Sequence, residues 1–263
     1  MRRYLRLYFY FIKFSLSKAM QFRLDFFFRI FMDIVFYLVQ FFFFNIIYKH
    51  TTLLAGWDLE QMNLFVAAFI FADAFHMTVF ANNSWWFPIS INQGKLDYYL
   101  TKPVSSFFFI GFKELAANSF LNLIIATGVL YYFLQPFILD VPKWQISSFI
   151  LLLLHGAFLY YMIYMIFLLP VFWTGSDRGF ADIFYAAEKI THRPDGIFTG
   201  FFRRFFLTIL PFSMIASYPT RFLFTETEQL SIFTDIAIGS GIVYIIVFIL
   251  WKLGLRNYSS ASS

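Results

Sequence analysis

The stretch ISSFILLLLHGAFLYYMIYMIFLLPVFW, residues 146–173, is an apolar run without a single Lys, Arg, Asp or Glu. A transmembrane helix needs about 20 mostly apolar residues, so this run is long enough to cross a bilayer. Its apolar residues follow one another without the two-residue alternation of a transmembrane β-strand. The run therefore predicts an all-α, polytopic membrane protein, provided that other parts of the chain look like it.

The composition of the whole chain fits a bilayer as its solvent. Of the 263 residues, 60% are hydrophobic and 24% aromatic, and the mean hydropathy is +0.68. Charged residues make up 13%, against about 25% in soluble domains. A soluble fold cannot hide so much apolar surface, which excludes cytosolic enzymes and disordered chains. The absence of Cys excludes disulfides, thiolate zinc sites and cysteine nucleophiles.

Hydropathy predicts six transmembrane helices, at residues 24–48, 62–80, 107–134, 146–173, 204–224 and 232–251. The fifth contains Pro211 and Pro219, which we expect to act as helix breaks and to make this span kinked or re-entrant. The spans form one transmembrane domain, residues 24–254, followed by a short tail, residues 255–263.

The Lys and Arg residues predict the orientation, because cytoplasmic loops of membrane proteins are enriched in them. With the N-terminus inside, the cytoplasmic segments hold fifteen and the outer loops three, so both termini are expected in the cytoplasm. The same bias accounts for the pI of about 9.3 without a nucleic-acid partner. The cytoplasmic set is Arg2, Arg3, Arg6, Lys13, Lys18, Arg23, Lys95, Lys102, Arg178, Lys189, Arg193, Arg203, Arg204, Lys252 and Arg256, and the outer set is Lys49, Lys143 and Arg221.

The N-terminal segment, residues 1–23, is too charged to span a bilayer. At the helical period Arg2, Arg6 and Lys13 fall on one face, while Leu5 and Phe9 lie away from it. Such a segment is predicted to be an amphipathic helix lying on the cytoplasmic leaflet. It serves either as a positively charged anchor or as an element that transmits motion.

Three charges in the first span, Asp25, Arg29 and Asp33, are spaced four residues apart. Charges in hydrocarbon are costly unless they are paired, and this spacing lets Arg29 bridge both carboxylates within one helix. We expect this polar stripe to be a latch or a contact with another helix or subunit. The alternative is that it lines a substrate path.

Polar residues also occur in the second and third spans. Asp73 and His76 are close enough for a proton relay or for an ordinary hydrogen-bonded helix contact. Glu114, Asn118 and Asn122 are four residues apart, a spacing at which amide side chains commonly bond to neighbouring helices.

Motifs of catalysis and metal binding do not occur in the sequence. Gly94-Lys95 resembles the end of a Walker A motif, but Ile89 stands where the motif needs its first Gly and Leu96 where it needs Ser or Thr. There is no H-E-x-x-H or G-x-S-x-G motif and no acidic cluster spaced for a metal. We therefore expect no enzyme activity and no bound cofactor, with energy supplied by another subunit.

The cytoplasmic loop between the second and third spans, residues 84–106, contains a short amphipathic helix. Gly94 can end one element, and Pro103 stops the next. Between them Leu96, Tyr99 and Leu100 form the apolar side of about two helical turns. This helix is either a simple interfacial turn or a lever for a soluble partner.

The loop sequence G-x-L-D-x-x-L-x-[KR]-P resembles the cytoplasmic loop of type-2 ABC-exporter permeases. A later region, with Arg193-Pro194, Leu210-Pro211 and Tyr218-Pro219, is similar to the same family's R-x-P…IP…P pattern, with Leu210 in place of the usual Ile. Together with the six spans and the N-terminal helix, the resemblance covers nearly the whole chain. The loop residues that carry it are Gly94, Lys95, Leu96, Asp97, Leu100, Lys102 and Pro103.

The resemblance implies a permease of the inner membrane that pairs with a second copy or a homologous permease. A separate ATP-binding-cassette ATPase would bind ATP and Mg and would contact the loop helix, above all through Leu96, Asp97 and Leu100. Membrane lipid is a further expected partner. The cargo of such exporters is lipid-like, a glycan or an amphipathic drug.

Two other functions are compatible with parts of the sequence. An ion-coupled secondary carrier would use Asp73, His76 and the polar stripe of the first span. Such carriers often have broken helices in matching halves, whereas the Pro breaks here are confined to the fifth span. A membrane scaffold without transport activity is the other possibility.

Overall fold

The computed structural model describes residues 2–19, 23–116, 119–200, 211–225 and 227–259. This part of the chain is helical and contains no β-strand, only an isolated bridge between Leu54 and Trp57. The long helices are α2 (Arg23–Ile47), α3 (Leu59–His76), α7 (Phe120–Leu134), α8 (Lys143–Leu168) and α13 (Gln229–Asn257). The shorter α-helices are α1 (Arg2–Ala19), α4 (Asn82–Asn92), α5 (Leu96–Leu100), α6 (Ser106–Phe112), α9 (Val171–Thr174), α10 (Phe180–Glu188) and α12 (Ser217–Phe224). A π-helical segment, η1 (Met77–Ala81), joins α3 to α4, and 3₁₀ turns form η3 (Gln135–Phe137), η4 (Lys189–His192), η5 (Asp195–Ile197) and η6 (Phe212–Met214).

Five helical stretches of the described chain are long and apolar enough to cross a membrane. They are Ile30–Ile47, Leu59–Asn92, Phe120–Phe137, Lys143–Thr174 and Gln229–Asn257. The second is 83% buried and the first only 11%, so α3 and α8 form the centre of the bundle while α2 exposes apolar side chains outward. These features confirm the all-α polytopic membrane fold.

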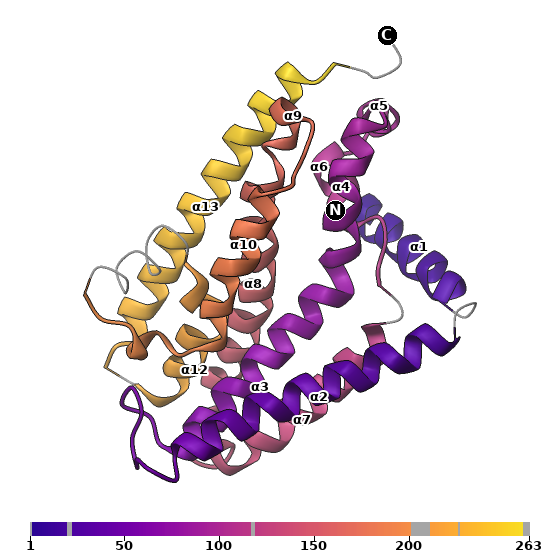
Figure 1. Ribbon diagram of the computed structural model, residues 1–263. Coiled ribbons are helices and arrows are strands. Elements are labelled where there is room, and N and C mark those ends of the chain that lie inside the picture. Colours follow the sequence, from indigo (N-terminus) through magenta and orange to yellow (C-terminus); the bar gives the residue numbers. More distant parts are fainter. Residues whose placement is uncertain (1, 20–22, 117–118, 201–210, 226, 260–263) are drawn as a thin grey trace.

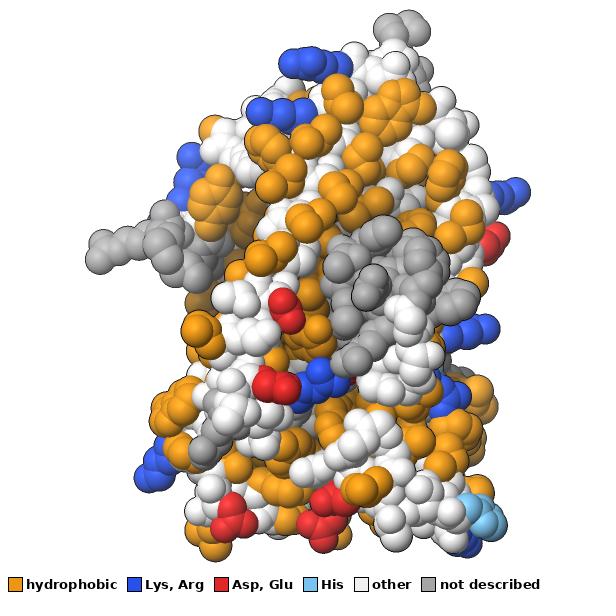
Figure 2. Space-filling view, turned by 90° about the vertical axis from the view of Figure 1, so that its left-hand side faces the viewer, with side chains coloured by type: hydrophobic (Ala, Val, Ile, Leu, Met, Phe, Trp, Pro, Cys, Tyr) orange, Lys and Arg blue, Asp and Glu red, His pale blue; other side chains and the backbone are white. Residues whose placement is uncertain are grey.

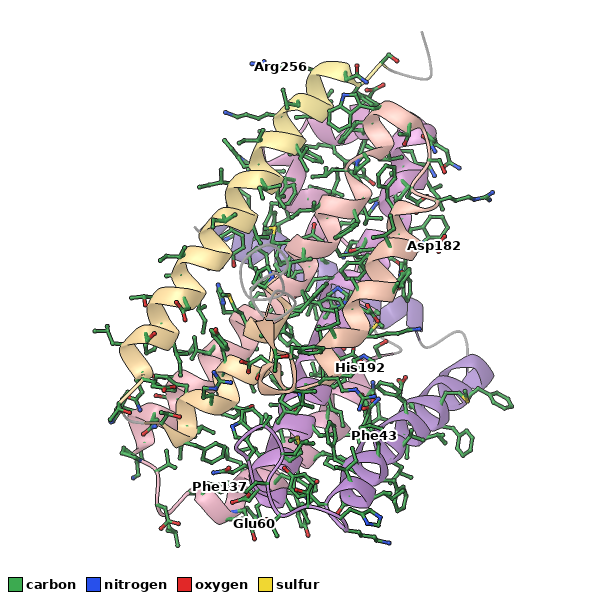
Figure 3. The ribbon with its side chains drawn as sticks, turned by 60° about the vertical axis from the view of Figure 1, so that its left-hand side comes forward. Phe43, Glu60, Phe137, Asp182, His192 and Arg256 are labelled. Atoms are coloured by element: carbon green, nitrogen blue, oxygen red, sulfur yellow. The ribbon has the colours of Figure 1, made fainter. Side chains whose placement is uncertain are left out.

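The bundle has two ends that can be defined by contacts between distant segments. At one end Asn92 Nδ2 donates to the carbonyl of Gly175 at 2.7 Å, and Asn257 Nδ2 donates to that of Phe172 at 2.8 Å. We call this the α5 end, because α5 follows α4 there (Figure 1). At the opposite end, the α12 end, Gln145 Nε2 donates to the carbonyl of Phe222 at 2.9 Å. Figure 3 shows Arg256 at the first end and Glu60 and Phe137 at the second.

The second span is longer than the predicted 62–80, since helical structure runs from Leu59 to Asn92. Several of its polar side chains lower the hydropathy but donate hydrogen bonds to backbone carbonyls within the helix. Ser84 Oγ donates to the carbonyl of Phe80 at 3.1 Å, and Asn83 Nδ2 to that of Val79 at 3.1 Å. The connection to the third span is therefore shorter than the predicted loop of residues 84–106.

The third span, predicted as one helix over 107–134, is broken between α6 and α7. Glu114 lies in the break, so it does not share a helix face with Asn122, and Asn118 is outside the described residues. The backbone groups freed by the break bond to the π-helical segment and its neighbour. Ala116 N–H donates to the carbonyl of Thr78 at 2.8 Å, and Asn83 bonds both to the N–H and to the carbonyl of Glu114, at 3.1 and 2.7 Å.

The predicted fifth span, residues 204–224, lies only partly within the described chain. Residues 204–210 of the predicted 204–224 lie outside the described part of the chain, and residues 211–224 form η6 and the short α12 at the α12 end. The chain instead returns from α9 along α8 as α10, η4 and η5 (Figure 1). With this passage, α3–α4, α6–α7, α8–α9, α10–η5 and α13 of the described chain run between the two ends, while α2 runs from the level of α1 to the α12 end (Figure 1).

Two contacts show that α10–η5 reaches the α12 end. The Arg193 guanidinium lies 3.9 Å from the ring centre of Phe43, near the end of α2. A Cβ on Gly196 would meet the Cβ of Ala55 at 2.9 Å. Arg193 is therefore at the α12 end, opposite to Lys95 and Arg256, with which the sequence pattern grouped it. Hydropathy missed this passage because it carries charged side chains at Asp182, Glu188, Lys189, Arg193 and Asp195.

The segment from Pro211 to α12 packs against α8. A Cβ on Gly156 would collide with the backbone of Ile215, so only Gly allows this close approach. Pro211 directly precedes the η6 turn, and its helix-breaking role stays a prediction because residues 201–210 lie outside the described chain. Pro219 differs, because it lies in the first turn of α12, where a proline is compatible with the helix.

Candidate functional site

The chain turns from α4 into α5 through Gly94, which has a φ of +68°. The Gly94 N–H donates to the carbonyl of Ile91 at 3.1 Å, and the Lys95 N–H to that of Ser90 at 3.0 Å. This pair of bonds is a Schellman motif, in which glycine takes the left-handed position at low cost. The turn joins α5 rigidly to the end of α4.

The apolar side chains of α5 point in different directions. Leu96 is fully buried in the core of the chain, and the Tyr99 ring packs 5.0 Å from that of Phe109. Tyr98 and Leu100 are 59% and 44% exposed. Leu96, predicted as an ATPase contact, therefore anchors α5 to the bundle, while Tyr98 and Leu100 form its outward face.

Charged residues surround this outward face. Lys95 is exposed, and the Lys102 ammonium lies 4.0 Å from the centre of the Tyr98 ring. Asp97 lies near Tyr258 at the end of α13, where burial and the Asp97 carboxylate raise the pKa of the Tyr258 phenol. The motif residues Gly94 to Pro103 thus form one compact surface at the α5 end.

A lysine connects α5 to the break in the third span. Lys113 Nζ donates to the Tyr99 hydroxyl at 3.0 Å, and it lies directly before Glu114, which Asn83 binds. The N-terminal helix joins the same region, since the Leu115 N–H donates to Ser15 Oγ at 3.0 Å. The break is therefore the meeting point of α1, α5 and the π-helical segment.

A polar cluster lies deeper in the bundle, between α3, α8 and α10. The Tyr160 hydroxyl donates to Glu188, and the Tyr164 and Tyr185 hydroxyls are 2.8 Å apart. The His76 ring lies 4.1 Å from that of Tyr160. Sequence reasoning found His76 but missed Glu188, because α10 reads as a loop. The Glu188 carboxylate in an otherwise aromatic segment was the available signal.

The predicted Asp73–His76 relay lacks its hydrogen bonds. Both ring nitrogens of His76 are buried without a partner among the described residues. Asp73 interacts electrostatically with Glu188 of α10 and with Asp33 of α2, so the three carboxylates belong to one region. The side chains of Asp25 and Arg29, the other members of the predicted stripe, lie outside the described structure. A separate contact ties α2 to α7, where the Tyr37 hydroxyl donates to Asn122 Oδ1 at 2.9 Å.

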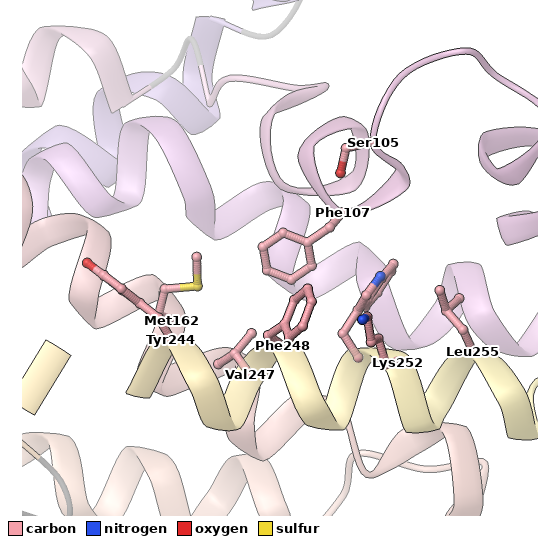
Figure 4. A pocket seen from close by; sticks show the side chains of 9 residues that line it. Ser105, Phe107, Met162, Tyr244, Val247, Phe248, Lys252 and Leu255 are labelled. Atoms are coloured by element: carbon pink, nitrogen blue, oxygen red, sulfur yellow. The ribbon is translucent and has the colours of Figure 1, made fainter. Parts of the chain in front are cut away.

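An apolar groove of about 430 Å³ opens laterally between α13, α8 and the start of α6. Figure 4 shows the rings of Phe107 and Phe248 facing one another in it, with Lys252 towards the α5 end. The surrounding surface is largely apolar, with Lys and Arg at the upper, α5 end and several Asp and Glu at the lower end (Figure 2). Among the described residues, no group of three or more His, Asp or Glu is placed to hold a metal ion.

The fold is that of a multi-pass helical membrane protein. A family model described as ABC-2 family transporter protein matches residues 34–262, so the chain belongs to this family. It is the membrane transport component, a permease, of an ABC transporter, and in this family the ATPase is a separate partner. Comparisons with curated proteins and with solved structures gave no match.

Proposed function

We propose that this permease is the membrane subunit of an ATP-driven exporter whose ATPase docks on the α5 end. The observation that carries the proposal is α5 itself, a short helix with Tyr98 and Leu100 facing outward on the buried anchor Leu96. ATP and Mg would be held by the partner, not by this chain. When the partner pushes on α5, α4 has to follow, because the Gly94 turn joins the two helices.

The charge distribution supports placing the α5 end in the cytoplasm of a cell with an inner membrane, with both termini on that side. Although Arg193 lies at the α12 end, basic residues remain in excess at the α5 end. Arg193 and Arg221 at the α12 end are held by Phe43 and Asp195, while acidic residues are frequent there. Basic residues described at the α5 end are Lys95, Lys102, Arg178, Lys252 and Arg256, and acidic residues at the α12 end include Asp58, Glu60, Asp140 and Glu228.

Hydrogen bonds offer a physical route from α5 into the bundle. Tyr99 binds Lys113, and the adjacent Glu114 binds Asn83. Asn83 lies just after the π-helical segment, and His76 of the polar cluster lies directly before that segment. The steps are hydrogen bonds, connections along the chain and the contact between the rings of His76 and Tyr160. We propose that motion of α5 reaches the Tyr160–Glu188 pair along this route.

The transported molecule is proposed to be lipid-like, a glycan or an amphipathic compound. The interior cluster combines aromatic rings with the hydroxyls of Tyr164 and Tyr185 and the carboxylate of Asp73. Such a surface can contact both apolar and hydroxyl-bearing parts of a cargo. A second copy of the chain, or a homologous permease, would complete the pathway, and α2 has the largely unburied apolar surface for such an association.

The proposal is tested by replacing the outward face of α5. Tagged full-length chain with Tyr98→Asp or Leu100→Asp is expected to lose the copurifying ATPase and its nucleotide hydrolysis, while Tyr98→Phe and Leu100→Met retain both. Mass spectrometry of the captured subunits and phosphate release are the measurements. Undiminished capture and hydrolysis with both Asp variants would exclude α5 as the docking element.

A further inference from the structure

A groove of about 270 Å³ lies between the start of α1 and the turn that follows α5. It adjoins the outward face of α5 through Lys102 and is separate from the interior polar cluster. One wall belongs to α1 and the other to the turn and to α6. The lining residues are Arg3, Arg6, Leu7, Tyr10, Lys102, Pro103, Val104 and Phe109.

Three positive charges border this groove, and no carboxylate of the described residues forms an ion pair with them. Arg3 and Arg6 are exposed, and neither forms an ion pair with the described part of the chain. Lys102 contacts the face of the Tyr98 ring, which leaves its charge intact. Arginine guanidinium groups match the oxygens of a phosphate, to which they donate paired hydrogen bonds.

The rest of the groove is apolar. Leu7 and Phe109 come from opposite walls, and Pro103 and Val104 add no further charge. A free anion gains nothing from such a lining, whereas an anion attached to a hydrocarbon chain does. The combination of cations and apolar walls therefore favours an amphipathic anion.

The exposed side chains of α1 place the groove at the depth of lipid headgroups. Phe9 and Phe14 are about 70% exposed on a helix whose other exposed residues include Arg3 and Arg6. A basic helix with exposed aromatic rings lies in the interface of a membrane, with the rings towards the hydrocarbon. Aromatic edge contacts hold α1 to α6 at this level, with Tyr4 and Phe108 at 4.8 Å and Phe11 and Phe109 at 5.2 Å.

We propose that this groove binds the phosphodiester headgroup of an anionic phospholipid from the leaflet around the α5 end. The phosphate lies between Arg3, Arg6 and Lys102, and the upper part of an acyl chain lies against Leu7 and Phe109. Lys102 and Pro103 directly follow α5, so a bound lipid bridges α1 to the coupling turn. The lipid thereby holds α5 in place relative to the membrane surface.

The test is lipid binding to the full-length chain in neutral detergent, measured by native mass spectrometry with dioctanoyl phosphatidylglycerol. Each Lys or Arg near an anionic surface contributes roughly 1 kcal/mol, so Arg3→Gln/Arg6→Gln is expected to weaken binding by about 25-fold and Lys102→Gln by about fivefold. Arg178→Gln/Arg256→Gln removes the same charge from exposed positions at the same end and is the matched control. It is expected to change binding by less than about twofold.

Three results would overturn the proposal. An equal loss in the control variant would mean attraction by general surface charge. Equally tight binding of dioctanoyl phosphatidylcholine would mean that the headgroup charge is not recognised, and displacement by glycerol phosphate at equal concentration would mean a phosphate site without a lipid. Because Lys102 is not part of α1, an unchanged affinity in Lys102→Gln would also count against the site even if the α1 variant fails to fold.

Discussion

Asn83 replaces part of the backbone hydrogen bonding that the break in the third span loses. Its amide is 1% exposed and bonds to both the N–H and the carbonyl of Glu114, as a neighbouring peptide group would. In a membrane such backbone groups need protein partners, because the hydrocarbon supplies none. One side chain therefore makes an irregular segment tolerable inside the bundle.

Asn83→Leu is expected to lower the free energy of unfolding by about 2–3 kcal/mol, because it removes the hydrogen bonds of Asn83 to both backbone groups of Glu114. Asn82→Leu is the matched control, since Asn82 is half-buried and makes no such bonds in the described structure. Denaturation in detergent micelles measures the difference. Equal stability of the two variants would show that Asn83 is not needed at the break.

Asp195 and Arg221 form a buried ion pair at 2.6 Å, with Ser217 Oγ donating to the same carboxylate oxygen at 2.5 Å. Arg221→Met is expected to destabilise the chain by about 3–5 kcal/mol, since it removes the guanidinium that pairs with the buried carboxylate of Asp195. The double variant Asp195→Asn/Arg221→Met should recover part of this loss. Strictly additive effects in this cycle would mean that the pair contributes no coupling.

At the level of elements, α5 has one side chain in the core, Leu96, and an exposed side with Tyr98 and Leu100. Leu96→Ala is expected to lower the free energy of unfolding by about 2–4 kcal/mol, because Leu96 fills the core at the end of α4. Leu100→Ala should change it by less than about 0.5 kcal/mol, because that side chain is exposed. The comparison needs only thermal unfolding of the two variants. A similar loss in both would place Leu100 in the core as well.

The sequence was most informative where an element is uniformly apolar. α2, α8 and α13 follow the hydropathy closely, and α5 lies between Gly94 and Pro103 as predicted, because its limits depend on local turn chemistry. α10 could not be predicted in this way, since its charged residues are accommodated by tertiary contacts such as Tyr160 with Glu188. The break at Glu114 also depends on a tertiary contact, since its hydrogen-bond partner Asn83 belongs to another span. It was therefore not predicted from the sequence.

At the level of the whole molecule, the passage of α10–η5 between the two ends makes a topology prediction. The chain has no Cys, so single cysteines can be labelled without removing others. Cysteines at Lys95 and Arg256 are expected to react with a membrane-impermeant maleimide from one side, and cysteines at Glu60 and Ile197 from the other. Labelling of position 197 from the Lys95 side would contradict the passage and restore a loop there.

The π-helical segment Met77–Ala81 has a mechanical consequence for this architecture. A π turn holds one residue more than an α turn, so converting it to regular α-helix rotates everything beyond it by about 100° about the helix axis. Beyond it lie α4 and, through the Gly94 turn, α5. A change in winding of one residue at the bundle's midpoint would therefore swing the Tyr98–Leu100 surface through more than a quarter of a circle.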